Sequence, residues 1–444
     1  MIIPSSSIFD QSPLTALLEY DPVVQDYRTF FALLDWPVVE QWQEQQSAYC
    51  GTHGHPITAY LKAFLIRIRE KMIYATELRS FLLHHPLLIL EVGFSLHLDP
   101  TTAYGFDAEK TLPSRYWFSQ KLRDLDPALL QGLLHATVRD LKEEIPGLGE
   151  VVAFDGKHIY GWVKENNERA YVKDRYDKTK IPVGDPDCKL GVKRSTNQEQ
   201  SDGTIKEKKE LIWGYGSGVA AATTPDYGDV VLAEYTQPFN EGDITYFRPL
   251  YQQTVVALEQ FPTHVTADAA FDAWYVYDTA ARHGGIGAVP KNQHGHPTFE
   301  RDPDGVPRCP KGLRMHPTSP FAHPSGYRAQ MYRCPLYFPQ PLEGATCDHK
   351  QFTAAKGCVK HINIEPGGLM RVTLDRTSPL YQALYTQRTS CERINSQAQA
   401  LGIENPKVHN RRSVANLNTL IYVIINVRAL DRVKSIQRGL LQMS

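Results

Sequence analysis

The 444-residue sequence lacks a charge excess, a long apolar run and a dense set of cysteines. Its 48 Lys and Arg residues balance 49 Asp and Glu residues, which excludes a protein that coats nucleic acid by bulk charge. The apolar stretches at 81–90 and 420–427 fall short of the roughly 18 residues that span a bilayer, so no membrane partner is expected. Seven dilute cysteines and no leader pattern predict a reduced, cytoplasmic protein.

Apolar periodicity divides the chain into four segments. Residues 1–149 have helical spacing throughout and predict an all-helical N-terminal domain. In residues 150–292, short apolar runs alternate with amphipathic stretches, which predicts an α/β fold with a mixed sheet flanked by helices. Residues 293–368 are rich in Pro, Gly, His and Cys and are interpreted as an insertion. The fold then resumes over 369–444, with one long helix expected at 379–401.

Three acidic residues have positions typical of catalytic carboxylates. Asp155 ends the strand candidate that begins at Val151, Asp268 ends the strand candidate at 265–268, and Glu392 lies in the middle of the helix predicted at 379–401. Three such groups can hold two divalent cations that activate water and stabilise the leaving oxygen. Hard oxygen ligands favour Mg²⁺ or Mn²⁺. Taken singly, each residue is more often a helix cap or a solvated side chain. Asp272, which precedes a predicted helix, is interpreted as an N-cap.

The last carboxylate carries a family resemblance. Tyr385, Arg388 and Glu392 have the spacing Tyr-x2-Arg-x3-Glu, which is similar to the signature of insertion-sequence DDE transposases. Asp155-Gly156 and the Asp268-x-x-Phe pattern resemble the family's two aspartate motifs. The resemblance covers about 150–292 and 369–430. It implies a ribonuclease-H-like fold, two-metal cleavage and joining of DNA, and a bacterial cytoplasmic protein. Terminal inverted repeats and target DNA would be its partners, and a homodimer on DNA is expected.

Several basic and aromatic residues are expected to contact DNA. On the family reading, Tyr385, Arg388 and Arg393 contact DNA, and Arg388, one helical turn before Glu392, holds a phosphate beside the metals. A core aromatic is the other reading of Tyr385. The family also has a lysine seven residues after the glutamate, where this chain has Gln399. Lys407, Arg411 or Arg412 would have to supply that charge. From residue 385 onward, nine Lys and Arg face three acidic residues, which fits a local phosphate-binding surface.

The insertion contains a candidate zinc site. Cys309, Cys334, Cys347 and Cys358 lie within 50 residues, and four thiols can bind zinc tetrahedrally. No pair has the Cys-x-x-Cys spacing, so unpaired thiols in a small β-rich insertion remain the alternative.

In the N-terminal segment, residues 112–123 could form a DNA recognition helix with Arg115, Lys121 and Arg123 outward. An ordinary amphipathic helix is the other reading of that stretch.

The sequence thus predicts a DDE transposase with Asp155, Asp268 and Glu392 as its metal ligands. A ribonuclease-H-like nuclease without strand transfer is the nearest alternative. A domesticated DNA-binding protein that does not cleave DNA is the alternative that is not an enzyme. A metallohydrolase that acts on small molecules is a fourth possibility.

Overall fold

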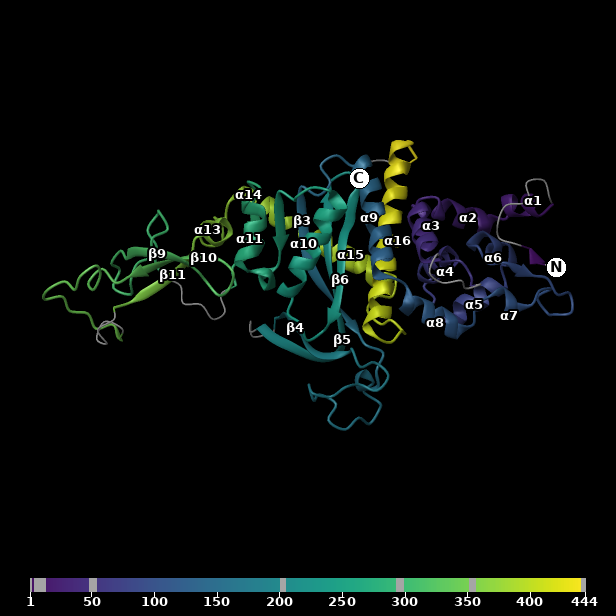
Figure 1. Cartoon of the computed structure of the whole chain (residues 1–444), viewed down its shortest axis with the longest axis horizontal. Helices are drawn as coiled ribbons and strands as arrows, with labels where there is room; N and C mark the ends of the chain where they lie inside the picture. The colour runs from purple at the N-terminus through teal and green to yellow at the C-terminus, as the bar shows by residue number, and fades with distance from the viewer. Residues whose placement is uncertain are drawn as a thin grey trace. The chain divides into compact units, whose positions relative to one another are not determined.

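The computed structural model describes residues 2–3, 13–47, 54–199, 205–292, 299–350 and 357–440. It has a mixed α/β architecture, as predicted (Figure 1). The chain divides into two compact units, the first made of residues 1–149, 153–260 and 389–444, and the second of 150–152 and 261–388. The helices expected to form a separate N-terminal domain therefore share a unit with part of the sheet.

The N-terminal part of the first unit is helical. Its helices are α1 (Pro13–Tyr20), α2 (Pro22–Phe31), α3 (Trp36–Ser47), α4 (Ile57–Arg69), α5 (Ala75–Leu83), α6 (Pro86–Val92), α7 (Ala108–Thr111), α8 (Arg115–Asp124) and α9 (Pro127–Glu144). Asp126 caps α9 by accepting a hydrogen bond from the Ala128 amide at 2.9 Å. A short ladder of β1 (Ile2–Ile3) with β2 (Leu96–His97) corrects the expectation that this region has no strand.

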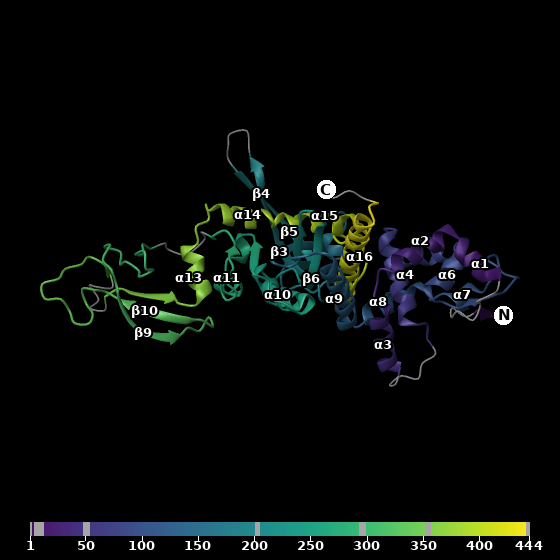
Figure 2. The ribbon, with the colours of Figure 1, turned by 90° about the horizontal axis from the view of Figure 1, so that it is seen from above.

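The central sheet has the strand order β4-β5-β3-β7-β8, and β6 also pairs with β5. Within the first unit, β4 (Lys189–Glu199), β6 (Gly228–Pro238) and the long β3 (Val151–Tyr160) all run antiparallel to β5 (Ile205–Thr224). The β4–β5 pair extends away from the rest of the sheet (Figure 2). The polar stretch 164–210 is dense in both charges, and its sequence predicts a solvated excursion. This prediction is wrong over the second half of the stretch, where charged residues form a β-hairpin.

Glycines in β5 allow α10 (Ile244–Leu258) to lie directly on the sheet. A Cβ atom at Gly216 or Gly218 would collide with the side chain of Tyr246, which is buried against this strand. The absence of side chains at these positions therefore sets the close approach of the helix to the strand.

The helix α16 (Arg411–Gln437) is the central core helix of the first unit. It is long and apolar enough to cross a membrane by length and composition, yet 83% of its apolar window is buried inside the protein. Asn426 in its middle accepts a hydrogen bond from the Val231 amide of β6 at 2.9 Å and donates to the Val231 carbonyl at 2.8 Å. Figure 1 shows α16 running beside α9. These contacts identify a helix of a protein core.

Among its described residues, the second unit contains the remaining strands and several short helices. The parallel pair β7 (His264–Ala267) and β8 (Gly287–Ala288) continues the sheet from the first residues of β3, and the His264 amide donates to the Glu150 carbonyl at 2.8 Å. Around them lie η2 (Ala269–Phe271), α11 (Trp274–Ala281), α13 (Pro366–Thr373) and α14 (Pro379–Thr386). The predicted insertion contains the antiparallel sheet β9 (His316–Ala322), β10 (Arg328–Arg333) and β11 (Val359–Asn363).

The long helix expected at 379–401 is two helices. α14 ends at Thr386, and α15 (Thr389–Ala400) begins after a turn at Gln387 and Arg388. Tyr385 therefore lies on α14 and Glu392 on α15. Arg388 lies in the turn between these helices, and not one helical turn before Glu392 within a single helix.

Candidate active site

Asp155 lies in the middle of β3, five residues before the strand ends. It is opposite Val219 of β5 in the antiparallel register, and its side chain is half-buried. The expectation that Asp155 ends its strand is therefore wrong, because pairing with β5 continues through Gly156 to Tyr160. The preceding residue Phe154 is fully buried. Strand alternation therefore directs Asp155 to the face opposite that of Phe154.

The helix α15 meets β3 and β5 at the level of Asp155. The Asn395 side-chain amide donates from Nδ2 to Oδ2 of Asp155 at 3.0 Å. One turn earlier, Cys391 Sγ lies 4.0 Å from the carbonyl oxygen of Val219, the cross-strand partner of Asp155. Two independent contacts thus fix this helix over the same pair of residues.

Glu392 is exposed on α15, three residues before Asn395. Residues three apart on a helix are neighbours on its surface, so Glu392 lies next to the amide that holds Asp155. Two of the three predicted carboxylates therefore lie on elements of the first unit that contact each other, Asp155 on β3 and Glu392 on α15.

Asp268 belongs to the second unit, directly after β7. Its Oδ1 accepts a hydrogen bond from the Ala270 amide at 2.9 Å, so it caps the short helix η2. The side chain is partly exposed. The cap and the predicted ligand role are compatible, because a carboxylate has several lone pairs and this bond uses one oxygen.

Asp272 does not cap α11 as interpreted from the sequence. Its side chain is almost fully buried, and the Arg371 guanidinium donates to both carboxylate oxygens at 2.7 Å. The Tyr277 hydroxyl and the Asn292 amide also donate to it, at 2.9 and 2.8 Å. Burial acts to raise the pKa of Asp272, but the hydrogen bonds from Arg371 and Asn292 outweigh it and lower the pKa below its usual value. Asp272 is therefore a structural ion-pair partner.

Tyr385 and Arg388 form a pair at the end of α14. The Arg388 guanidinium lies 5.6 Å from the centre of the Tyr385 ring, and this ring stacks on Tyr381 at 5.8 Å. Tyr385 is half-buried and packs against the small core of Ala288, Tyr381 and Leu384. The contact holds the Arg388 guanidinium beside Tyr385, directly before α15 begins at Thr389.

The other predicted DNA-binding residues contact the protein itself. Arg393 makes a two-point ion pair with Asp229 at 2.7 Å. The Arg411 guanidinium donates to the Thr236 carbonyl at 3.2 Å, and that of Arg412 donates to the Leu125 carbonyl at 3.1 Å. The Nζ atom of Lys407 lies 6.0 Å from the centre of the Trp162 ring. Arg411 and Arg412 thus hold the start of α16 in place.

Arg393 also lines a basic cleft beside α15. The cleft has a volume of about 390 Å³, and its lining includes Arg428 and Arg432. Asp229 is the single carboxylate among the described residues that line it. Because Asp229 is paired with Arg393, the cleft has a net positive charge next to the helix of Glu392.

The cysteines of the insertion share a small core. Cys309, Cys334 and Cys358 are buried with Met315, and Cys347 is partly exposed. Burial is the main cause that raises the pKa of the Cys358 thiol, to about 12. Within the described ranges, no group of three or more His, Cys, Asp or Glu side chains is arranged to hold a metal ion. Zinc binding by these four cysteines stays a prediction.

The three predicted carboxylates have the donor chemistry that Mg²⁺ or Mn²⁺ requires. All three offer hard oxygen atoms, and none is buried. Asn395, which sequence reasoning missed, orients one of them. Its position three residues after Glu392, on the same face of the helix, is the signal that could have identified it.

No protein-family model, no curated protein and no solved structure matches this chain.

Proposed function

We propose that this protein is a DDE transposase that cuts the ends of a mobile DNA element and joins them to target DNA. The proposal assigns Asp155, Asp268 and Glu392 as the ligands of two Mg²⁺ or Mn²⁺ ions. It includes a ribonuclease-H-like catalytic domain, double-stranded DNA with terminal inverted repeats as substrate, and a homodimer on that DNA. The expected site of action is the cytoplasm of a bacterium.

The contact between Asn395 and Asp155 is the observation that carries this proposal. It holds a strand carboxylate against a helix whose neighbouring surface residue is a second carboxylate. Because Glu392 is exposed, a metal ion held by Asp155 beside this helix would have access to its carboxylate. The motif spacing and the buried contacts of α15 thus point to the same pair of residues.

The chain's own residues have separate roles in the proposed reaction. The bound ions would stabilise charge on the phosphate oxygens that react. Asn395 holds Oδ2 of the Asp155 carboxylate and so restricts its rotation. The basic cleft of Arg393, Arg428 and Arg432 would bind backbone phosphates beside the site. Arg388 would bind a further phosphate at the start of α15.

A cleavage assay tests the proposal. The purified chain is incubated with Mg²⁺ and duplexes that carry the element's own ends, and wild type is compared with Glu392→Gln. Glu143→Gln on the exposed side of α9 is the matched control, since it makes the same chemical change far along the chain from the motif. We expect cuts at the element boundary from wild type and the control, and none from Glu392→Gln.

The products separate the alternatives. Joined strands identify a transposase, whereas cuts without joining identify a nuclease on the same scaffold. Tight end binding without any cut identifies a DNA-binding protein that has lost cleavage. Boundary cuts that persist in Glu392→Gln would contradict the assigned carboxylates.

A further inference from the structure

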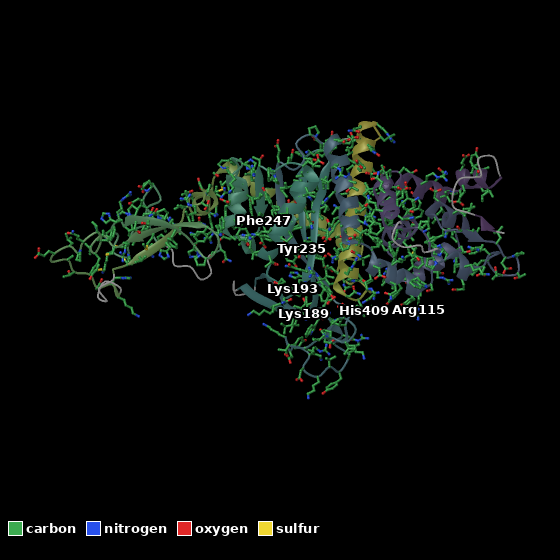
Figure 3. The ribbon with its side chains drawn as sticks, in the orientation of Figure 1. Arg115, Lys189, Lys193, Tyr235, Phe247 and His409 are labelled. Atoms are coloured by element: carbon green, nitrogen blue, oxygen red, sulfur yellow. The ribbon has the colours of Figure 1, made fainter. Side chains whose placement is uncertain are left out.

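A second cleft in the first unit combines aromatic rings with cations. It has a volume of about 450 Å³, within the range of sites that bind a group of small-molecule size. Segments far apart in the sequence line it: the start of α5, the helix α8, the loop after β3 and the residues that precede α16. Figure 3 labels two of the lining residues, Arg115 of α8 and His409, which precedes α16.

The lining of this cleft is positively charged. It includes Arg67, Arg115, Arg123 and Lys407, and no Asp or Glu occurs among its described residues. Arg67 is buried and donates to the Ile73 carbonyl, so it supports the wall. Arg115 is exposed, and Lys407 is partly exposed. At least two cations are therefore available to an anionic ligand, although Arg123 pairs with the neighbouring Asp124 at 3.0 Å.

Aromatic rings form the other feature of the cleft. Trp162 stacks on His409 with ring centres 4.7 Å apart and an angle of 13° between the planes. Tyr74 lies 6.3 Å from Trp162, and Tyr116 projects from α8. Trp162 is 41% exposed and Tyr116 58% exposed, so both rings are partly accessible. Exposed apolar groups that are contiguous mark binding sites more often than those scattered singly over a surface.

The rings are held by local structure. Asn410 adopts a left-handed backbone conformation, with φ of 66°, and its side chain caps α16 by accepting from the Ser413 amide at 2.9 Å. This fixes the direction of His409 just before the helix. On the other side, Asn166 donates to the Gly161 carbonyl at 2.8 Å and so holds the loop that carries Trp162. The stacked pair is therefore built before any ligand arrives.

We propose that this cleft binds an unpaired base of single-stranded DNA, with its phosphates on Arg115 and Lys407. Stacked rings beside cations suit single strands, because every base has an open face only when it has left the duplex. An acidic peptide would satisfy the cations but would leave the rings uncovered. The inference rests on the proposed function, since it extends DNA binding by this chain to unpaired nucleotides.

The cleft is distinct from the carboxylate site, because neither Asp155 nor Glu392 is among its lining residues. Trp162 follows Asp155 by seven residues, which span at most about 23 Å at roughly 3.3 Å per residue.

Binding of labelled oligothymidine in EDTA tests the inference without any cleavage. We expect Trp162→Ala to weaken binding about 5- to 100-fold, as loss of a stacking ring does, and Trp162→Phe to retain most of the affinity. Trp117→Ala is the matched control, because Trp117 is 55% exposed on α8 but does not line the cleft. Lys407→Ala should lower the slope of log affinity against log salt by about 0.7.

Three results would overturn the inference: binding unchanged in Trp162→Ala, an equal loss in Trp117→Ala, or equal competition by polyglutamate or by a duplex of the same length. A circular dichroism melt checks that each variant is folded.

The two proposals can fail independently of each other. Glu392→Gln should bind oligothymidine like wild type. If the protein cleaves element ends but its binding of oligothymidine does not depend on Trp162, only the proposed role of the cleft is contradicted. If binding depends on Trp162 but element ends are not cleaved, only the transposase proposal is contradicted.

Discussion

The contact of Asp155 with the helix of Glu392 and the aromatic cleft are two regions of the first unit that are built in different ways. The first lies on regular structure, where strand pairing and a helix fixed by Asn395 and Cys391 determine where Asp155 and Glu392 point. The second is made of helix ends and loops, where Trp162 and His409 meet only because distant segments pack together. Rigid elements suit groups that must hold reacting atoms, whereas loops suit a surface that grips a flexible strand.

The comparison predicts that the two regions can be disabled independently, and the largest effect should come from Asp155→Asn. We expect a loss of cleavage of about 10³-fold or more, because several kcal/mol of charge stabilisation at the phosphate depend on this carboxylate. Oligothymidine affinity should not change. Gel assays of cleavage and fluorescence anisotropy of binding measure the two effects on the same preparation. A parallel loss of both activities would show that the regions are not independent.

A smaller effect should arise in the core that supports both regions. Glu234 is fully buried, and its Oε1 accepts a hydrogen bond from the Thr419 hydroxyl of α16 at 2.6 Å. Burial raises the pKa of Glu234 to about 7, and the bonds from Thr419, Thr236 and Gln131 only partly oppose this. The folded state therefore holds a proton that the unfolded chain releases above pH of about 4.5.

The pH dependence follows from that difference. The stability contribution of Glu234 is fully present below about pH 4.5 and is lost as the pH rises to about 7. We expect Glu234→Gln to be more stable than wild type by up to roughly 3 kcal/mol at pH 8, and to show no such gain at pH 4. Urea unfolding at both pH values measures this. An equal difference between the proteins at the two pH values would contradict the assigned titration.

The smallest expected effect concerns the orientation of Asp155. Asn395→Ala removes a hydrogen bond to a charged group, which is worth about 1.5–3 kcal/mol, so we expect a 10- to 100-fold loss of cleavage. Raising the Mg²⁺ concentration should restore part of that loss, which it should not do for Asp155→Asn. Asn395→Asp should be the more severe variant because it brings a second negative charge to Asp155. Full activity in Asn395→Ala would show that the strand alone orients Asp155.

The strands beside Asp155 and Asp268 could be predicted from the sequence because their signals are local. A short apolar run followed by Asp identifies a strand near Asp155 and another before Asp268, and Glu392 has a fixed spacing from Tyr385. The same reasoning ended β3 too early, since Gly156-Lys157-His158 has no apolar alternation although it pairs with β5. It missed the β4–β5 hairpin for the same reason, because charged strands that extend from a sheet carry no buried face.

The remaining features depend on contacts between distant residues. Asp272 was interpreted as a cap from its neighbours, but its partner Arg371 lies 99 residues further along the chain. Trp162 and His409 are more than 200 residues apart, so no local pattern relates them. Arg411 and Arg412 donate to backbone carbonyls of other segments, and these contacts depend on tertiary packing. The sequence alone shows only that both residues are positively charged.

Iron-directed cleavage of the polypeptide is the most direct test of the central claim. Fe²⁺ replaces Mg²⁺ in the protein, and hydroxyl radicals produced with ascorbate and peroxide cut the backbone near the bound ion. The account predicts cuts near residues 155, 268 and 392 that disappear with excess Mg²⁺ and in Glu392→Gln. Cuts that are confined to other segments, or that are insensitive to Mg²⁺, would contradict the assignment of these three carboxylates to one metal site.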